Sequence, residues 1–427
     1  MLDIELFRTN LEKIIESEKK RFKEPLNATK TLEYDKKWRE TLVKIQELRK
    51  KRNEISTQIA EFKKLGDEVK TKIAIKESKE IKERIDDLEK EKKTFFEERE
   101  KYRYVVGNII HETVPIAETE EGNEIVRSMG RITKFEFKPL NHVELIEIID
   151  GADIKKPSEV VGSRFYYLKG DIVMLNLALM RFALNFLQSK GFTLMWTPYF
   201  IKHQIIKAAA ELADFEEQLY KIQDEDLFMI ATSEQTLAAY HYDEIIDPKH
   251  LPIKYAGISS CFRREAGSHG KDTLGIFRVH QFEKVEQYIF CSPEDSWKFH
   301  EELIENAEDL YKQLELPYRI VNIASGELND NAAKKYDLEA WFPASKTYRE
   351  LVSCSNCLDY QARKLKIRMG KVGSEEKQIL HTLNSTAIAT ERTICCILEN
   401  YQNEDHSIRI PKVLQKIMGK KVIKSIK

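Results

Sequence analysis

Residues 28–104 restrict the fold of this 427-residue chain more than any other segment, because they contain no proline and a single glycine, Gly66. Apolar residues recur there at alternating spacings of three and four, the pattern of a coiled-coil seam. The seam positions are Ile45, Leu48, Arg52, Ile55, Ile59 and Phe62, then Ser78, Ile81, Ile85, Leu88, Lys92, Phe95, Arg99 and Tyr102. Because Lys64-Leu65-Gly66-Asp67 indicates a turn, the segment predicts two antiparallel helices of about 35 residues, each roughly 50 Å long.

The same segment carries 23 Lys/Arg and 18 Asp/Glu, an excess of five positive charges, in a chain whose net charge is −1. Any nucleic-acid contact is therefore expected at local patches rather than over the whole surface. A helical pair with many charges is also typical of a dimerisation or partner-binding coiled coil. The residues alone leave both alternatives open.

The sequence contains no run of 18 apolar residues, so it predicts no membrane span. The first residues, MLDIELFRTNLEKI, lack the apolar core of a signal peptide and contain acids that a transit peptide avoids, so we expect a cytoplasmic protein. All six cysteines follow residue 260, which argues against a disulfide framework. Cys354 and Cys357 have the spacing of half a zinc site. The other close pair, Cys395 and Cys396, is adjacent on an apolar helix and points to different sides, so we expect buried thiols and no zinc.

The stretch Ile258–Phe290 contains two β-like runs on either side of a glycine-rich loop. Residues two apart in a strand share a face. The expected shared face carries Arg278, His280, Phe282 and Glu286, with Arg263 across the hairpin. Guanidinium groups suit phosphate oxygens, and an aromatic ring suits a base. The stretch therefore predicts a nucleotide site rather than an ordinary surface hairpin.

The run CFRREAGSHGKDTLGIFRVHQFEKVEQ within this stretch resembles motif 2 (about 258–290) of the class II aminoacyl-tRNA synthetases, in the form found in seryl-tRNA synthetases. Its details favour the eukaryotic cytosolic and archaeal branch. Lys190-Gly191-Phe192 with Pro198 resembles motif 1 (about 190–200), which builds the dimer interface in that family. HTLNSTAIATERTI, from His381, resembles motif 3 (about 381–400).

The resemblance implies an α+β fold, in which helices flank an antiparallel catalytic sheet of six to eight strands behind a coiled-coil hairpin. We expect a tRNA-binding domain at 1–110 with its arm at about 28–104, a linker at 111–130 and a catalytic domain at 131–427. In seryl-tRNA synthetases the arm grips the long variable arm of the tRNA, which suits recognition of duplex RNA by shape. The resemblance also implies a homodimer.

ATP and Mg²⁺ are implied at motif 2, motif 3 and the segment TYRELVSCSN. The expected ATP-binding residues are Arg263, Arg264, Glu265, Arg278, Val279, His280, Gln281, Phe282, Glu350, Leu351, Val352, Ser353 and Arg392. By resemblance, Arg263 and Arg392 are the catalytic cations, and Arg392 completes an adenine sandwich with Phe282. Glu350 and Ser353 are expected to hold Mg²⁺ through ATP. Taken singly, Phe282 is also typical of a core ring and Glu350 of a solvated acid.

The serine pocket is implied at a second set of positions. The expected serine-binding residues are Thr232, Ser233, Glu234, Arg263, Glu286, Asn384 and Thr386. Thr232-Ser233-Glu234 follows an apolar run and opens a helix, which also fits simple helix capping. Ser385 and Thr386 are expected to cap the motif 3 helix. Ala387 and Ala389 replace glycines of the general motif, as small residues also do in the seryl branch.

The resemblance thus implies a serine–tRNA ligase, which forms seryl-adenylate from L-serine and ATP and charges tRNA(Ser), and tRNA(Sec) where the host contains it. A non-catalytic RNA-binding paralogue is expected to lack Arg263, Glu265 or Arg392, and all three are present. A ligase that acts on a carrier protein usually lacks the long arm. The lysine-rich residues after Pro411 are expected to form a solvated terminus.

Overall fold

The protein is described here by a computed structural model, which describes residues 1–209, 216–265, 274–371, 373 and 377–426. The chain divides into two compact units, Met1–Gly107 and Asn108–Lys427. The glycine-rich loop predicted between the two β-like runs includes Gly267, His269, Gly270, Lys271 and Asp272, all of which lie outside the described residues.

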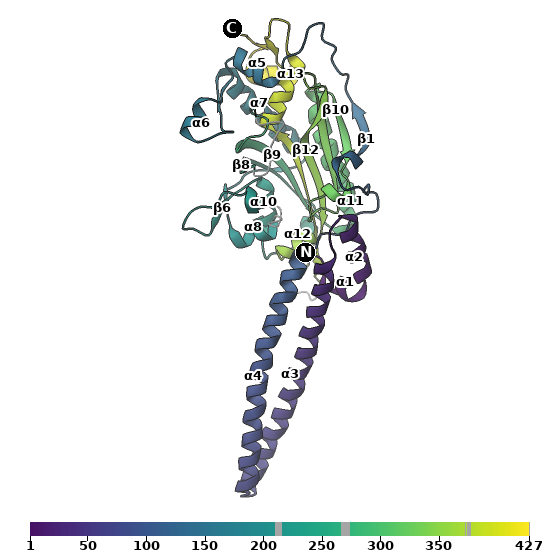
Figure 1. The fold of residues 1–427 in the computed structure, drawn as a ribbon, viewed down its shortest axis with the longest axis vertical. Helices are drawn as coiled ribbons and strands as arrows, with labels where there is room; N and C mark the ends of the chain where they lie inside the picture. Colours follow the sequence, from purple (N-terminus) through teal and green to yellow (C-terminus); the bar gives the residue numbers. More distant parts are fainter. Residues whose placement is uncertain (210–215, 266–273, 372, 374–376, 427) are drawn as a thin grey trace. The chain divides into compact units, whose positions relative to one another are not determined.

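The first unit is built on two long helices, α3 (Leu26–Lys64) and α4 (Glu68–Tyr104), preceded by α1 (Ile4–Thr9) and α2 (Leu11–Lys20). The helices α3 and α4 run antiparallel beside each other (Figure 1). Gly66 has a φ of +71° in the turn, and the Asp67 side chain accepts a hydrogen bond from the Lys70 amide at 3.0 Å. The predicted helical hairpin and its turn are confirmed.

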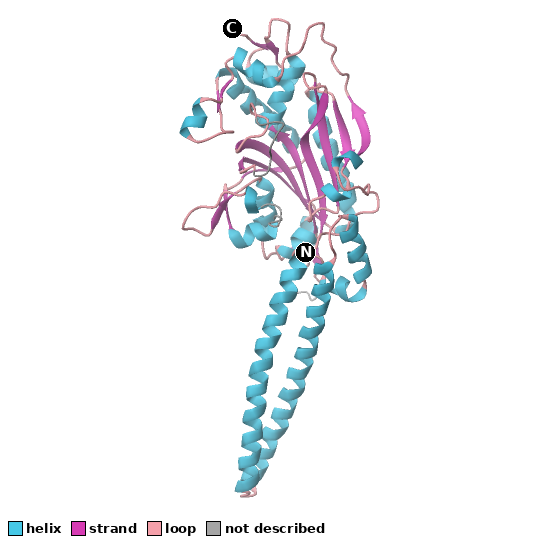
Figure 2. Cartoon of the chain, viewed as in Figure 1, coloured by secondary structure: helices cyan, strands magenta, loops and turns pink. Residues whose placement is uncertain are grey.

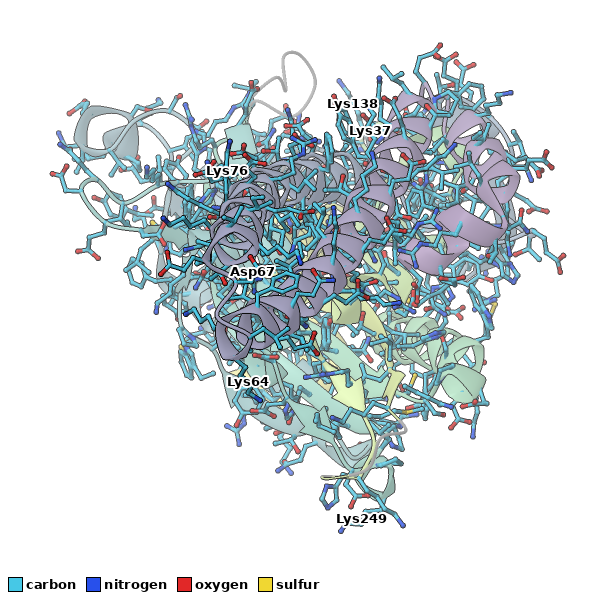
Figure 3. The ribbon with its side chains drawn as sticks, turned by 90° about the horizontal axis from the view of Figure 1, so that it is seen from below. Lys37, Lys64, Asp67, Lys76, Lys138 and Lys249 are labelled. Carbon is cyan, nitrogen blue, oxygen red and sulfur yellow. The ribbon has the colours of Figure 1, made fainter. Side chains whose placement is uncertain are left out.

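Predicted seam residues form the core between α3 and α4. The buried cluster consists of Ile45, Ile55, Ala74, Ile81, Ile85 and Leu88, with Leu48, Ile59 and Phe62 packed against it. Ala74 is a core residue that the heptad pattern missed. Charged side chains project from both helices, and Lys37, Lys64 and Lys76 are labelled among them in Figure 3.

One charged seam residue is buried because it has a carboxylate partner on the other helix. Arg99 is 6% exposed, and its Nη1 lies 3.1 Å from Oδ1 of Asp35, which is itself fully buried. Arg8 and Arg39 approach the same carboxylate at 2.8 and 2.9 Å. A buried charge is tolerated when it is paired and hydrogen-bonded, so this cluster explains an arginine at a seam position.

The second unit is organised around an eight-stranded sheet in the order β1-β10-β11-β12-β15-β9-β8-β4 (Figures 1 and 2). Its strands are β1 (Glu124–Met129), β10 (Tyr318–Asn322), β11 (Lys334–Phe342), β12 (Thr347–Leu358), β15 (His381–Ala389), β9 (Gln281–Cys291), β8 (Ile253–Phe262) and β4 (Thr193–Trp196). All neighbours pair antiparallel except β4 and β8, which are parallel. The predicted α+β fold with an antiparallel sheet is confirmed. The stretch 111–130, expected as a linker, supplies the edge strand β1.

Helices cover the sheet on both sides. The longer ones are α7 (Gly170–Ser189), α11 (Ser296–Gln313) and α13 (Thr390–Tyr401), and the shorter ones α5 (His142–Ile148), α6 (Lys156–Val160), α8 (His203–Ala209), α10 (Ser233–Ala238), α12 (Tyr360–Lys364) and α14 (Lys412–Met418). Short paired strands complete the unit: β2 (Ala152–Asp153), β3 (Tyr167–Leu168), β5 (Phe200–Lys202), β6 (Leu227–Met229), β7 (Ile245–Ile246), β13 (Arg368–Met369), β14 (Gln378–Ile379), β16 (Ile408–Arg409) and β17 (Val422–Ile423).

Alternation along the strands separates the main core from a polar face. On β9, Val285 and Ile289 pack into the core with α7, α11 and α13, whereas Glu286 points to the opposite face. On β15, Leu383 is in that core and Asn384 on the polar face. Successive side chains of a strand point to opposite sides. The sheet therefore packs one face into the core and presents polar residues on the other.

Helix α7 is long and apolar enough to cross a membrane by length and composition alone. Its residues Leu175, Leu179 and Phe182 lie in the main hydrophobic core, as expected for a core helix of a globular unit. The segment after Pro411 also differs from expectation, because Leu414 and Met418 of α14 are buried and β17 pairs with β16. The prediction of a solvated terminus is wrong there, since apolar residues between the lysines pack onto the core.

Candidate active site

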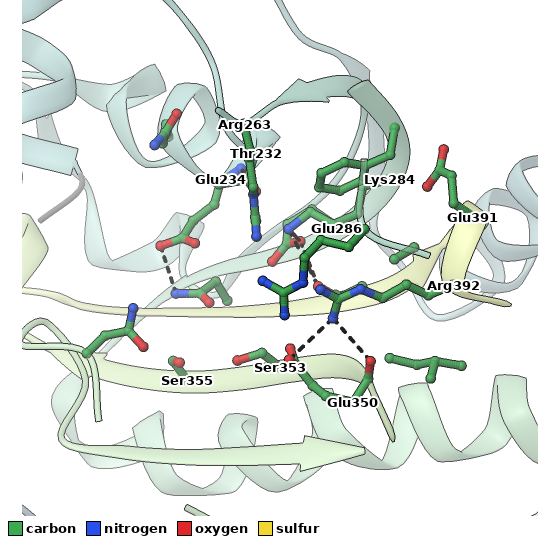
Figure 4. A pocket seen from close by; sticks show the side chains of 18 of the residues that line it. Thr232, Glu234, Arg263, Lys284, Glu286, Glu350, Ser353, Ser355, Glu391 and Arg392 are labelled. Atoms are coloured by element: carbon green, nitrogen blue, oxygen red, sulfur yellow. Dashed lines mark hydrogen bonds and ion pairs between the residues drawn. The ribbon is translucent and has the colours of Figure 1, made fainter. Parts of the chain in front are cut away.

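A pocket of about 260 Å³ opens on the polar face of the sheet (Figure 4). Strands β9, β11, β12 and β15 supply its floor, and the starts of α10 and α13 supply side chains at its rim. Its lining includes Thr232, Glu234, Arg263, Glu265, Arg278, Val279, Phe282, Glu286, Glu350, Leu351, Ser353, Asn384, Thr386 and Arg392. These predicted residues come from four distant parts of the sequence, and the fold brings them together.

Arg263 follows directly after β8 and is held at its backbone by His280. The amide of Arg263 donates to the His280 carbonyl at 2.9 Å, and the His280 ring Nδ1 lies 2.7 Å from the Arg263 carbonyl oxygen. The Arg263 side chain donates through Nε to the Ala231 carbonyl at 3.3 Å. Its guanidinium carbon lies 5.2 Å from the centre of the Phe282 ring, within cation–π range.

Arg392, in the first turn of α13, forms the opposite side of the pocket with Glu350 of β12. Its Nη1 donates to the Glu350 carbonyl oxygen at 3.1 Å and lies 3.3 Å from Oε2 of the same residue. Its guanidinium carbon lies 5.2 Å from the Phe277 ring centre. Burial alone raises the pKa of Glu350, but the charges of Arg392, Lys335 and Arg263 outweigh burial and lower that pKa. Glu350 therefore carries a negative charge at neutral pH.

A second ion pair lies at the start of the motif 2 loop. Arg278 Nη1 is 3.1 Å from Oε2 of Glu265, and both side chains line the pocket. Glu265 has a φ of +48°, which is uncommon for a residue with a Cβ. Such a backbone conformation is retained where the surroundings hold it, and it is typical of functional sites.

Buried acids occupy the other end of the pocket. Thr232 caps α10 and accepts a hydrogen bond from the Glu234 amide at 3.1 Å, which agrees with the helix capping that the sequence left open as an alternative. Glu234 Oε1 accepts from the Asn384 amide at 3.1 Å and from Gln361 at 2.9 Å. The pKa of Glu234 is raised to about 7, mainly by burial and secondly by the negative charge of Glu286.

Glu286 forms the most buried ion pair of this end. Its Oε2 lies 2.5 Å from the ammonium of Lys284 and accepts from the Thr386 hydroxyl at 3.3 Å. Burial raises the pKa of Glu286, although Lys284 and Thr386 act against that shift. The arrangement presents two acids to a small cavity, which suits a substrate with an ammonium group and a hydrogen-bonding side chain.

Some predicted residues lie near the pocket without lining it. These are Ser233, Arg264, His280, Gln281 and Val352. The expected capping of the motif 3 helix is wrong: Ser385 and Thr386 lie within β15, which continues to Ala389, and Ala389 takes the N-cap position without a side-chain hydrogen bond.

Other lining residues were not predicted, among them Gln235, Phe277, Lys284, Asn329, Asn331, Lys335, Ser355 and Glu391. Residues two apart in a strand share a face, so the predicted positions of Phe282 and Glu286 could have identified Lys284 between them. Lys335 and Ser355 come from β11 and β12, whose register no local pattern reveals.

Glu350 and Ser353 offer one carboxylate and one hydroxyl to a metal ion. The described residues contain no group of three or more His, Cys, Asp or Glu side chains arranged around a metal. Mg²⁺ commonly binds to one or two carboxylates together with substrate phosphates and water. The donor set at β12 therefore fits a magnesium ion that arrives with a nucleotide.

All six cysteines are buried.

The fold and the pocket can be compared with known proteins. Residues 218–401 match the family model of the tRNA synthetase class II core domain (G, H, P, S and T), so the second unit contains a class II aminoacyl-tRNA synthetase core. Residues 1–110 match the model of the seryl-tRNA synthetase N-terminal domain. A serine–tRNA ligase of Methanosphaera stadtmanae is 57% identical over 423 residues, which cover 99% of both chains.

Two solved structures agree over the full chain. The seryl-tRNA synthetase from Pyrococcus horikoshii complexed with ATP has a TM-score of 0.97 and 44% identity, covering 100% of both chains. The cytoplasmic serine–tRNA ligase from Naegleria fowleri in complex with AMP has a TM-score of 0.90 and 44% identity, covering 100% of this chain and 99% of that one. The chain belongs to the seryl-tRNA synthetase family. The predicted family and enzyme class are confirmed, and the catalytic interpretation holds over the non-catalytic paralogue.

Proposed function

We propose that the pocket activates L-serine with ATP and Mg²⁺ to form seryl-adenylate, and that the enzyme then transfers serine to tRNA(Ser). One observation carries this proposal: the pocket joins arginines beside an aromatic ring at one end to a pair of buried acids at the other. A nucleotide and an amino acid require these two environments side by side. In the first step, a serine carboxylate oxygen bonds to the α-phosphorus, and the bond to the bridging oxygen breaks, its electron pair leaving with diphosphate.

We assign the ATP end as follows. Arg263 bridges the serine carboxylate and the α-phosphate, for which its two-pronged guanidinium is suited. Phe282 and Arg392 hold adenine between them, and Arg278 binds the γ-phosphate. Glu265 faces adenine or the tRNA acceptor end. Catalysis of this type depends on positioning and charge neutralisation rather than on a protein nucleophile.

Glu350 and Ser353 are the residues that would hold Mg²⁺ together with the phosphates of ATP. When bound, the ion supplies positive charge to phosphate oxygens. The low pKa of Glu350 supports this role, because a metal ligand of this kind must be ionised.

We assign the amino-acid end to the two buried acids. Glu234, with Thr232, binds the serine ammonium, and Glu286 accepts a hydrogen bond from the serine hydroxyl. Asn384 and Thr386 close the pocket. A site built to hydrogen-bond a hydroxyl disfavours alanine, because the buried polar groups would lose their partner.

We further propose that the arm formed by α3 and α4 binds the long variable arm of tRNA(Ser), and of tRNA(Sec) where the host contains it. The net positive charge of 28–104 and the projecting lysines support phosphate contact. The test is serine charging of a tRNA(Ser) transcript and of the same transcript without its variable arm. We expect charging of the first and a large loss with the second; equal charging of both would contradict this role of the arm.

We propose that the enzyme is a cytoplasmic homodimer joined through motif 1. The supporting observation is exposed apolar residues in motif 1 and on the helix before it: Trp196 on β4 is 75% exposed, and Val173, Met174 and Leu177 on α7 are 36%, 46% and 49% exposed. Apolar surface of this kind is typical of a protein–protein contact. Analytical ultracentrifugation tests it, with Leu177→Arg expected to shift the protein toward the monomer.

A further inference from the structure

Lys335 is a pocket cation to which the proposed function assigns no role. It lies on β11, in register with Ser355 of β12, and both residues line the pocket. Two positions further on, Asp337 is in register with Ser353, which we have assigned to the magnesium site. The side chain of Lys335 is 14% exposed, so its charge is screened less than that of a fully solvated lysine.

The ammonium of Lys335 has only a distant carboxylate partner. Its one ion pair with the described residues is to Oδ2 of Asp337, at 3.8 Å. By contrast, Lys284 lies 2.5 Å from Glu286, and Arg278 lies 3.1 Å from Glu265. Lys335 is therefore less tightly neutralised than these two pocket cations.

Asp337 pairs with Lys335 at 3.8 Å and is in register with Ser353, so it connects Lys335 to the strand position of a proposed magnesium ligand. It is 7% exposed, and its Oδ1 makes no hydrogen bond with the described residues. Lys335 is also one of the positive charges that lower the pKa of Glu350 against the effect of burial, and both residues line the pocket. The ammonium is thus within electrostatic reach of the carboxylate that we assign to the metal and the phosphates.

We infer that Lys335 binds the β- and γ-phosphates of ATP and the diphosphate that leaves, and that Asp337 is the residue that positions it. This inference rests on the proposed function and adds a residue to it. As the bond between the α-phosphorus and the bridging oxygen breaks, the electron pair and negative charge move onto diphosphate. A lysine near that group acts as a point charge that stabilises it.

The test is calorimetric binding of inorganic diphosphate with Mg²⁺, of ATP, and of L-serine to Lys335→Met, Lys335→Arg and the wild type. We expect Lys335→Met to weaken the binding of diphosphate and of ATP by about tenfold or more, which is the usual effect of losing a hydrogen bond to a charged group. Serine binding is expected to stay within about twofold, and Lys335→Arg to recover most of the affinity for diphosphate. Lys298→Met, on the exposed side of α11, is the matched control.

The variant Asp337→Asn tests whether Asp337 positions Lys335 rather than binding phosphate itself. It keeps the size of the side chain, and we expect it to lose less diphosphate affinity than Lys335→Met does. In the Lys335→Met background the same change should have no further effect, because coupled residues are not additive. If Lys335→Met does not fold, Lys335→Gln and Asp337→Asn are measured in the same way.

Unchanged diphosphate and ATP affinities in folded variants would overturn the inference. So would a loss confined to serine binding or to the KM for tRNA, since either places Lys335 at another part of the site. Absence of serine-dependent exchange in the wild type would instead contradict the proposed function, while diphosphate binding would still test Lys335.

Discussion

Arg392 and Glu350 are joined twice, through the carbonyl oxygen of Glu350 at 3.1 Å and its carboxylate at 3.3 Å. The contact links the first turn of α13 to β12, and so links the end of the pocket that we assign to adenine to the proposed magnesium ligands. The Glu350 side chain keeps 46% of its surface accessible. A metal ion bound there would share the carboxylate with Arg392.

Replacing Glu350 by Gln is therefore expected to raise the Mg²⁺ concentration needed for half-maximal ATP–diphosphate exchange by about tenfold or more, because the charged ligand is lost. The carbonyl contact to Arg392 remains, so serine affinity should not change. A magnesium titration of the exchange rate measures the effect. Glu305→Gln, on the exposed side of α11, is the control. An unchanged magnesium requirement would remove Glu350 from the metal site.

Arg263 and Arg264 are neighbours with different surroundings. Arg263 lines the pocket, whereas Arg264 does not. Arg263→Ala is expected to lower the exchange rate by roughly 10² to 10³-fold, the usual effect of losing one group that stabilises developing charge. Arg263→Lys should also be strongly impaired, because a lysine cannot form the two-pronged contact.

Arg264→Ala serves as the matched control and should retain most of the activity. Exchange kinetics at saturating serine distinguish the variants. Comparable losses for Arg263→Ala and Arg264→Ala would contradict the assignment of Arg263.

The raised pKa of Glu234 predicts that serine binding depends on pH. Burial raises its pKa to about 7, so the carboxylate becomes protonated as the pH falls through 7 and can no longer pair with the serine ammonium. The Kd of serine should therefore rise below about pH 7 and level off above it. Calorimetric titration from pH 6 to 8 measures this dependence.

In Glu234→Gln, the dependence should be absent and binding weak throughout. The same pH profile in that variant would show that another group is responsible.

The arm depends on Asp35, which faces Arg99 across the helices. Burial acts to raise the pKa of Asp35, but Arg8, Arg99 and Arg39 outweigh it and hold that pKa below 3.8. The stabilisation is thus present at neutral pH and is lost as the pH falls through and below that value.

Asp35→Ala leaves the buried Arg99 without this partner, and removing one member of a buried pair costs about 3–5 kcal/mol. Hydrogen exchange of the full-length protein should show faster opening of α3 and α4. Glu40→Ala, at an exposed position of α3, should leave the exchange unchanged. Equal protection in Asp35→Ala and the wild type would contradict the prediction.

The sequence predicted the parts that depend on local pattern. Heptad spacing identified α3 and α4, and the turn at Gly66 followed from the stretch Lys64-Leu65-Gly66-Asp67. Motif 2 and motif 3 led to Arg263, Phe282 and Arg392, which line one pocket.

Features set by strand register were not predictable. Lys335 joins the pocket only because β11 pairs with β12 so that it faces Ser355. Thr386 was expected at a helix cap, but β15 continues past it, because its pairing with β9 places Thr386 opposite Glu286. Arg99 at a seam position was explained only by Asp35, 64 residues away in the chain.

Activation of serine at this pocket is tested by ATP–diphosphate exchange with each of the twenty amino acids, for the wild type and Arg263→Ala. We expect exchange with serine alone in the wild type and its loss in Arg263→Ala. Exchange with a different amino acid, or none with any, would contradict serine activation.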